Sequence, residues 1–500
     1  MKKQNLPMII IILIIITSGI FLFFTGNITN YPILNQKKDE NIKTESLALG
    51  DKVDNITLSI EPLGVVYVDG YLWVCERYGD LYKINPQTGA EILHHNLPFN
   101  PSGLGYDGNY FYIGLREPLN GTIYKYTTDG IYVDEFTVPV STNYVSGITY
   151  DGTNLWATKD EPSNIIFKIN PSNGDILSSF NVLYQYCGLM WLNDRLWAID
   201  WSDGEVHIID PSTTEITEII ELDDSDYGKW GITNNGTHYF VSDWNEYEIR
   251  IMEIPTEAGE VWNYRSTPEN HPLDIAYNGT HYFLTDKDAN KIDILDASTL
   301  RNVSSFSVPF NPSGIAVVGE NLYISEELGV SKIYKYSHTG TEITSFSTSH
   351  GYYALEYDGS KLWASDWAAN YIRELSIVDC SEVNSYSVPV DYAGICYDSR
   401  NDVFWSLNWT TNKIIQLDTS FNQTGVKYDA PGPSGEFGIE FNGEHLVVTS
   451  WGEDKIYKVI INLPLETQPI PGFTAYFLIM TMLSLVVVIL LLKRNSILKI

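Results

Sequence analysis

Short alternations of apolar and polar residues recur along the chain, and residues 147–180 show the pattern most plainly. The run GITYD at 147–151 has the two-residue period of a half-buried strand. Asp151-Gly152 follows and suits a tight hairpin, because glycine adopts positive φ at no steric cost. Three more strand-like runs, LWAT, IIFKI and DILSSF, are separated by KDEPSN and by PSNG, which are turn-forming sequences. The stretch therefore predicts four antiparallel strands joined by three turns.

Variants of this pattern occur ten times. The repeats start at intervals of 39–44 residues, at Gly64, Gly103, Gly147, Gly188, Gly231, Asp274, Gly314, Ala354, Gly394 and Gly438. One sheet of this size cannot bury both of its faces, and packing several copies around an axis solves that problem. The sequence therefore predicts an all-β fold, a β-propeller of ten four-stranded blades of about 40 residues each.

A longer period divides the ten repeats into two sets. PFNPSG occurs at 98–103 and again at 309–314, and other segments match at offsets of 206–211 residues. We therefore expect a duplicated five-repeat unit, with five-bladed propellers at residues 54–258 and 259–462. Residues 55–60 and 260–266 are expected to be outer strands that complete the last blade of their own unit. One ten-bladed ring is the alternative, although propellers usually have four to eight blades.

The two ends of the chain carry membrane signals. Residues 1–25 are basic and then apolar, which predicts a signal peptide or a signal anchor, followed by a linker at 26–53. After a second linker at 463–472, the uncharged run 473–492 is long enough to span a bilayer as a helix. Basic residues flank both apolar runs and place the tail, 493–500, in the cytoplasm. We therefore expect a protein of the cell membrane whose large middle part is extracellular.

Composition narrows the choice of partners. The formal net charge of −32 argues against nucleic acid or an anionic membrane surface as a partner. An acidic surface is compatible with Ca²⁺, but no D-x-D-x-D-G loop is present, and no other cofactor is indicated. The four cysteines, Cys75, Cys187, Cys380 and Cys396, lack C-x-x-C spacing, so they are expected to be buried apolar residues, with a Cys380–Cys396 disulfide as the alternative. Eight N-x-[ST] sequons are compatible with a glycosylated exterior.

Two segments resemble known families. The blade motif G-[IL]-x-[YF]-[DN]-G-x-x-[LY]-[WF] resembles the repeats of NHL, SMP-30 and streptogramin-lyase-like propellers, which implies the fold but no single activity, since that superfamily contains enzymes and binding proteins. The segment Pro471-Gly472-Phe473, with its apolar run and basic tail, resembles the PGF-type sorting signals of archaeal surface proteins. That resemblance implies cleavage by a sortase-like enzyme and lipid anchoring, although the usual Thr-rich linker is missing.

Aromatic and acidic residues gather in one class of loops. In a four-stranded blade, the loops after strand 2 and those between strand 4 and the next strand 1 share one face. We expect this face to bind a surface protein or a glycan, since aromatic faces provide contact area and carboxylates bond hydroxyls. The candidate residues are Trp201, Trp244, Trp367, Trp409, Trp451, Tyr186, Tyr392, Trp230, Asp200, Asp243 and Asp366. The alternative is structural: each Asp would fix its own turn and each Trp would pack between blades.

Two other functions remain open. An extracellular propeller enzyme, a lyase or a metal-dependent hydrolase, would use acids that end strand 2 as metal ligands, as the SMP-30 resemblance implies: Glu76, Glu117, Asp160, Asp286 and Glu326. No histidine accompanies them at a recognisable spacing. His238, His281 and His445 share one slot of the repeat and would point apart. An architectural role in the cell envelope is the third function.

Overall fold

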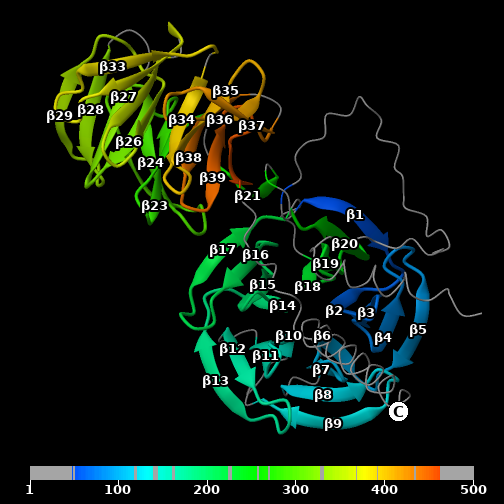
Figure 1. The fold of residues 1–500 in the computed structure, drawn as a ribbon. Helices are drawn as coiled ribbons and strands as arrows, with labels where there is room; N and C mark the ends of the chain where they lie inside the picture. Colours follow the sequence, from blue (N-terminus) through cyan, green and yellow to red (C-terminus); the bar gives the residue numbers. More distant parts are fainter. Residues whose placement is uncertain are drawn as a thin grey trace, which may run out of the picture. The chain divides into compact units, whose positions relative to one another are not determined.

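The computed structural model describes residue 48 and residues 51–461, apart from 118–120, 139–144, 160–163, 223–227, 256–257, 259, 268–270, 327–330, 367–368, 391 and 433–434. This part of the chain contains ten four-stranded antiparallel sheets, an arrangement consistent with a β-propeller (Figure 1). The prediction of ten four-stranded repeats is therefore confirmed. We call the sheets of β1–β20 the first half and those of β21–β40 the second half.

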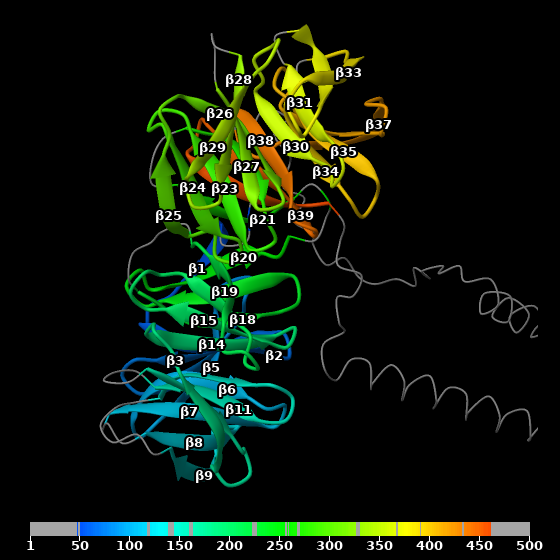
Figure 2. The same ribbon diagram turned by 90° about the vertical axis from the view of Figure 1, so that its left-hand side faces the viewer.

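Each half has five sheets, and the strands of one sheet lie side by side, as β6 to β9 do in Figures 1 and 2. The strands of the first half are β1 (Lys52–Thr57), β2 (Pro62–Val68), β3 (Tyr71–Glu76), β4 (Asp80–Ile84), β5 (Glu91–Asn96), β6 (Asn100–Tyr106), β7 (Tyr110–Glu117), β8 (Thr122–Thr127), β9 (Tyr132–Thr137), β10 (Val145–Tyr150), β11 (Leu155–Lys159), β12 (Ile165–Ile169), β13 (Ile176–Asn181), β14 (Tyr186–Leu192), β15 (Arg195–Asp200), β16 (Val206–Ile209), β17 (Ile216–Ile220), β18 (Lys229–Asn234), β19 (His238–Asp243) and β20 (Glu248–Glu253). Those of the second half are β21 (Val261–Ser266), β22 (Pro272–Tyr277), β23 (His281–Asp286), β24 (Lys291–Asp296), β25 (Asn302–Ser307), β26 (Pro312–Val318), β27 (Asn321–Glu326), β28 (Lys332–Ser337), β29 (Glu342–Ser347), β30 (Ala354–Tyr357), β31 (Leu362–Asp366), β32 (Tyr371–Leu375), β33 (Glu382–Ser387), β34 (Tyr392–Asp398), β35 (Val403–Asn408), β36 (Lys413–Leu417), β37 (Gln423–Asp429), β38 (Glu436–Phe441), β39 (His445–Ser450) and β40 (Lys455–Ile460).

The first strand of each half completes the last sheet of that half. β1 pairs with β20, and β21 pairs with β40, so the predicted outer strands are confirmed. β1 begins at Lys52, earlier than expected, because its backbone already pairs with β20 at that residue. The side chains of Lys52 and Asn55 also bond the Glu248 carboxylate on β20. Both pairings cover edges that would otherwise be open to other strands.

The first strands of neighbouring sheets lie against one another. In the first half, β2 contacts β6, β6 contacts β10, β10 contacts β14, and β14 contacts β18. The last of these strands, β18, contacts β2. The second half repeats this series with β22, β26, β30, β34 and β38, and β38 contacts β22. We call the position that starts each repeat the glycine slot. A Cβ on Gly188 would lie 2.1 Å from the carbonyl oxygen of Trp230, so the close approach of the backbones explains the recurring glycine.

Hydroxyl groups on several of the second strands link one sheet to the next. Thr285 accepts a hydrogen bond from the N–H of Asp274, which occupies the glycine slot of β22, at 2.9 Å, and donates one to the Ser313 carbonyl in the next sheet at 2.8 Å. Ser325 and Thr449 repeat this arrangement. In these three sheets a β-bulge spans the slot and interrupts the backbone pairing there, so these hydroxyls satisfy groups that would otherwise be buried without partners.

A second link between sheets lies two residues after the glycine slot. There, Thr149, Thr233, Glu356 and Glu440 each accept a hydrogen bond from a backbone N–H of the next first strand, at 3.0–3.1 Å. The bond from the N–H of Tyr277 to Glu440 joins β22 to β38, although 163 residues separate the two. Polar side chains at these positions therefore hold neighbouring sheets together.

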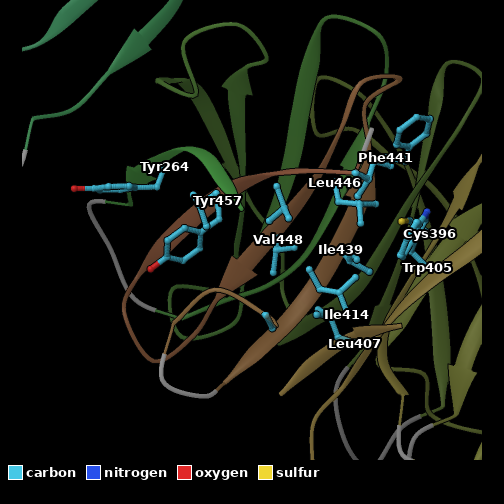
Figure 3. Packing of buried hydrophobic residues seen from close by; sticks show 14 of the residues in the cluster. Tyr264, Cys396, Trp405, Leu407, Ile414, Ile439, Phe441, Leu446, Val448 and Tyr457 are labelled. Carbon is cyan, nitrogen blue, oxygen red and sulfur yellow. The ribbon is translucent and has the colours of Figure 1, made fainter. Parts of the chain in front are cut away.

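Apolar side chains fill the space between neighbouring sheets. The largest such cluster of the second half contains Cys396, Trp405, Ile439 and Phe441 (Figure 3). All four cysteines are buried and none is in a disulfide, so the expectation of buried apolar residues is confirmed and the alternative of a Cys380–Cys396 disulfide is wrong in this structure.

The terminal predictions fall outside the described residues. These include the signal segment, both linkers apart from residues 48 and 51–53, the apolar run 473–492, the basic tail and the PGF motif. Within the described residues, no helix is long and apolar enough to cross a membrane.

Candidate functional site

The predicted acidic site residues lie inside the sheets and have internal partners. Asp243 accepts hydrogen bonds from two backbone N–H groups of its own turn, both at 3.1 Å, and from Nε of Arg250 at 3.2 Å. Asp366 accepts from Nε and Nη2 of Arg373 at 2.8 and 2.6 Å. Asp200 bonds the N–H and the hydroxyl of Ser202, and burial raises its pKa. All three carboxyls are buried, and their contacts favour the structural alternative.

Three of the predicted aromatic residues are also buried. The hydroxyl of Tyr186 lies 2.8 Å from Nδ1 of His207, and burial raises the pKa of that hydroxyl. The hydroxyl of Tyr392 accepts a hydrogen bond from Gln423 at 3.1 Å. Trp230 belongs to an apolar cluster of the first half. None of these three side chains presents an open face to a ligand.

In the first half, two of the predicted tryptophans lie at the surface or near it. Trp201 is 39% exposed, and its backbone N–H donates to the Gln185 carbonyl in the preceding loop at 2.9 Å. Trp244 is partly buried, with the Arg77 guanidinium carbon 4.9 Å from its ring centre. Trp367 lies outside the described residues.

In the second half, aromatic rings from three neighbouring sheets form one continuous row. Trp409 follows β35, Phe437 lies on β38, Trp451 follows β39, and His271 precedes β22. The ring centres are 4.6 Å apart for Trp409 and Phe437, 6.2 Å for Phe437 and Trp451, and 4.6 Å for Trp451 and His271. Trp409 and Trp451 are 37% and 40% exposed. We call these four residues the aromatic row.

Hydrogen bonds fix both ends of the Trp451–His271 pair. The backbone N–H of Trp451 donates to the Gly435 carbonyl at 2.9 Å. The N–H of His271 donates to Oδ1 of Asp454 at 2.9 Å, and its ring Nδ1 lies 2.5 Å from Oδ2 of Asp288. His271 has a φ of 66°, in the left-handed region that non-glycine residues rarely adopt, and these contacts hold it there.

The aromatic row combines apolar faces with polar groups at one end. Indole faces can stack on the apolar faces of a sugar ring or on apolar side chains. Because Nδ1 of His271 is bound to Asp288, the other ring nitrogen, Nε2, remains the ring's second hydrogen-bonding atom. The half-exposed carboxylate of Asp288 can accept hydrogen bonds from hydroxyls. This arrangement suits a ligand with flat apolar faces and several hydroxyl groups.

The acids considered as metal ligands are not gathered. Glu76 accepts a hydrogen bond from the N–H of Tyr78 at 2.7 Å, and Asp286 accepts one from that of Ala289 at 2.9 Å, so both hold their own turns. Across the described ranges, no group of three or more His, Cys, Asp or Glu residues could hold a metal ion. Asp160 lies outside those ranges.

Sequence reasoning did not select His271 and Asp288. Both lie in loops of the expected face, but the prediction covered only tryptophan, tyrosine and the acid that ends strand 2. His271 comes directly before Pro272, where β22 begins, and Asp288 comes two residues after Asp286, where β23 ends. His271 and Asp288 share one signal in the sequence: both can form hydrogen bonds, and both lie in the loops that carry the predicted tryptophans.

Comparisons with known proteins give distant similarities only. No protein-family model matches the chain, and no curated protein matches it. The chain is similar to the crystal structure of Myxococcus xanthus glutaminyl cyclase at 15% identity, with a TM-score of 0.36 and coverage of 40% of this chain and 94% of that one. It is similar to BamB from Moraxella catarrhalis at 10% identity, with a TM-score of 0.25 and coverage of 82% and 99%. It is similar to the structure of U3-55K at 12% identity, with a TM-score of 0.28 and coverage of 63% of this chain and 91% of that one. At such TM-scores these similarities carry no argument about function, and the resemblance to NHL-type repeats stays a prediction.

Proposed function

We propose that this chain is a cell-surface protein of two five-bladed β-propellers that binds glycans through the aromatic row of the second half. The contacts of β18 with β2 and of β38 with β22 support two separate rings over one ring of ten blades. The pairing of β1 with β20 and of β21 with β40, each within its own half, supports the same grouping. The terminal apolar runs and the basic residues beside them support anchoring in the cell membrane, with the sheets outside.

One observation carries the binding function: two partly exposed tryptophans from different sheets belong to one continuous row of rings. A tryptophan that served only to pack neighbouring sheets would be as buried as Trp405, which is 2% exposed. A glycan fits the row better than a protein surface does, because His271 and Asp288 place hydrogen-bonding groups beside the Trp451 face. Sugar rings present hydroxyls and apolar faces together.

The expected contribution of each tryptophan follows from its exposed area. A tryptophan side chain of about 250 Å² that is 40% exposed offers roughly 100 Å². If a sugar covers about half of that area, the contact contributes about 1.3 kcal/mol, or roughly tenfold in affinity. Removal of both rings should therefore weaken binding roughly 100-fold.

The test is a glycan array probed with the full-length protein in detergent, followed by calorimetric titration of the oligosaccharide that gives the strongest signal. We expect Trp409→Ala with Trp451→Ala to remove binding on the array. Trp201→Ala is the matched control, since Trp201 is equally exposed but lies in the first half. Unchanged binding by a folded double variant, or its loss in the Trp201 variant alone, would contradict the assignment to the aromatic row.

A further inference from the structure

A small, partly open cavity lies among the first strands of the first half. Its volume is about 10 Å³, and residues of β2, β6, β10, β14 and β18 all line it. Each of these strands contributes its glycine-slot residue to the lining, namely Gly64, Gly103, Gly147, Gly188 and Gly231. The residues after the slots, including Leu104 and Ile148, line it as well.

In the second half, a carboxyl group occupies the corresponding position. In β22 the glycine slot holds Asp274, whose side chain is 1% exposed. Its Oδ2 accepts hydrogen bonds from the N–H of Ile315 at 2.9 Å and from that of Leu355 at 3.2 Å. These two donors are the residues that follow the slots of β26 and β30. A single oxygen atom therefore bridges the backbones of two neighbouring sheets.

The two halves correspond residue by residue at this point. Gly64 takes the place of Asp274 in the first sheet, and Leu104 and Ile148 take the places of Ile315 and Leu355 in the next two. Substituting glycine for aspartate removes a carboxyl group, and the first half has a cavity lined by the residues that correspond to the carboxyl's two donors.

We infer that this cavity binds one water molecule, which accepts hydrogen bonds from the N–H groups of Leu104 and Ile148 as the Asp274 carboxyl does in the second half. A volume of about 10 Å³ is enough for one water molecule. The strands approach closely here, since a Cβ on Gly103 would lie 2.4 Å from the Ser146 carbonyl oxygen. Backbone carbonyl groups of the lining residues are the acceptors that this place offers for the protons of the water.

The lining favours water over an anion such as chloride. The residues that line the cavity in the described structure are glycine, serine, cysteine and aliphatic residues. No lysine, arginine or histidine is among them, so a buried negative charge would have no opposite charge to offset its loss of hydration.

The test is a crystal structure of the full-length protein at a resolution that shows ordered water, with crystals grown in sodium bromide. We expect one density peak within about 3.2 Å of both nitrogen atoms, without anomalous signal from bromide. A bromide peak there would overturn the assignment of water. An empty cavity, or a peak that contacts only carbonyl oxygens, would overturn the site itself.

Two variants extend the test to the second half. Asp274→Gly should create the same site there, with a new water between the N–H groups of Ile315 and Leu355. Asp274→Asn should not, because its amide oxygen can accept the same two hydrogen bonds. If Asp274→Gly does not fold, the structures of the wild type and of Asp274→Asn still test the proposal. In both proteins the water should be present in the first half and absent from the second half.

Discussion

Glu440 should make the second half less stable as the pH rises. Its carboxyl group is buried between β38 and β22, where it accepts hydrogen bonds from the N–H groups of Phe441 and Tyr277 at 2.7 and 3.1 Å. Burial raises the pKa of Glu440 to about 8. The carboxyls of Glu356 and Asp274 are also buried, and burial together with the nearby charge of Glu440 raises the pKa of both.

The direction and the size of the change in stability with pH follow from the raised pKa of Glu440. Between about pH 4.5, the ordinary value, and about pH 8, the folded protein retains a proton that the unfolded chain has lost. Stability is therefore fully present below pH 4.5 and is lost as the pH rises through 8. The difference between the two pKa values corresponds to as much as about 5 kcal/mol in the free energy of unfolding.

The perturbation is Glu440→Gln, which keeps the shape of the protonated acid and does not titrate. Its amide nitrogen cannot accept a hydrogen bond, so one of the two bonds is lost, at about 1 kcal/mol. The variant should therefore be slightly less stable than the wild type at pH 5 and more stable at pH 9. The two stability curves should cross between these values.

The assay is hydrogen exchange followed by mass spectrometry of peptides that contain β38 and β22, because the two halves need not unfold together. Glu444→Gln is the matched control, since its side chain lies in the next turn and is 70% exposed. Its curve should follow that of the wild type. Parallel curves for Glu440→Gln and the wild type would refute a protonated Glu440 in the folded protein.

Three further variants test the contacts between and within sheets. Thr233→Val removes the acceptor for the N–H of Tyr67, so thermal unfolding should show a loss of about 1–3 kcal/mol, whereas the exposed Thr344→Val should change little. Asp366→Ala leaves the buried Arg373 without its closest partner and should cost about 3–5 kcal/mol in denaturant unfolding, partly restored by Arg373→Met. The folded fraction of Asp366→Ala should bind the array glycan with unchanged affinity, and weaker binding would return Asp366 to the ligand site. Gly188→Ala places a Cβ 2.1 Å from a carbonyl oxygen and should lower the melting temperature, while Gly351→Ala, with no atom within 4 Å, should not; equal melting temperatures would contradict the packing at the glycine slots.

The candidate site was predicted only in part. Periodicity and turn residues placed Trp409 and Trp451 in the same class of loop as Trp201 and Trp244, and nothing in the spacing distinguished them. The structure separates them by neighbours: Phe437 and His271 extend the rings of the second half into one row, whereas Trp244 lies against Arg77. Tyr186 also matched the expected pattern, but its hydroxyl reaches the buried His207 on another strand.

The sequence by itself determined the ten four-stranded repeats and the outer strands β1 and β21, because hairpin turns and alternating residues act over a few positions. It also indicated where backbones approach closely, through the glycine that starts most repeats. Only the tertiary structure decided which polar groups are buried. The partners of Asp274 lie 41 and 81 residues away, and the Tyr277 N–H that bonds Glu440 lies 163 residues away. Burial and hydrogen bonding at these positions depend on contacts between whole sheets, which no local pattern specifies.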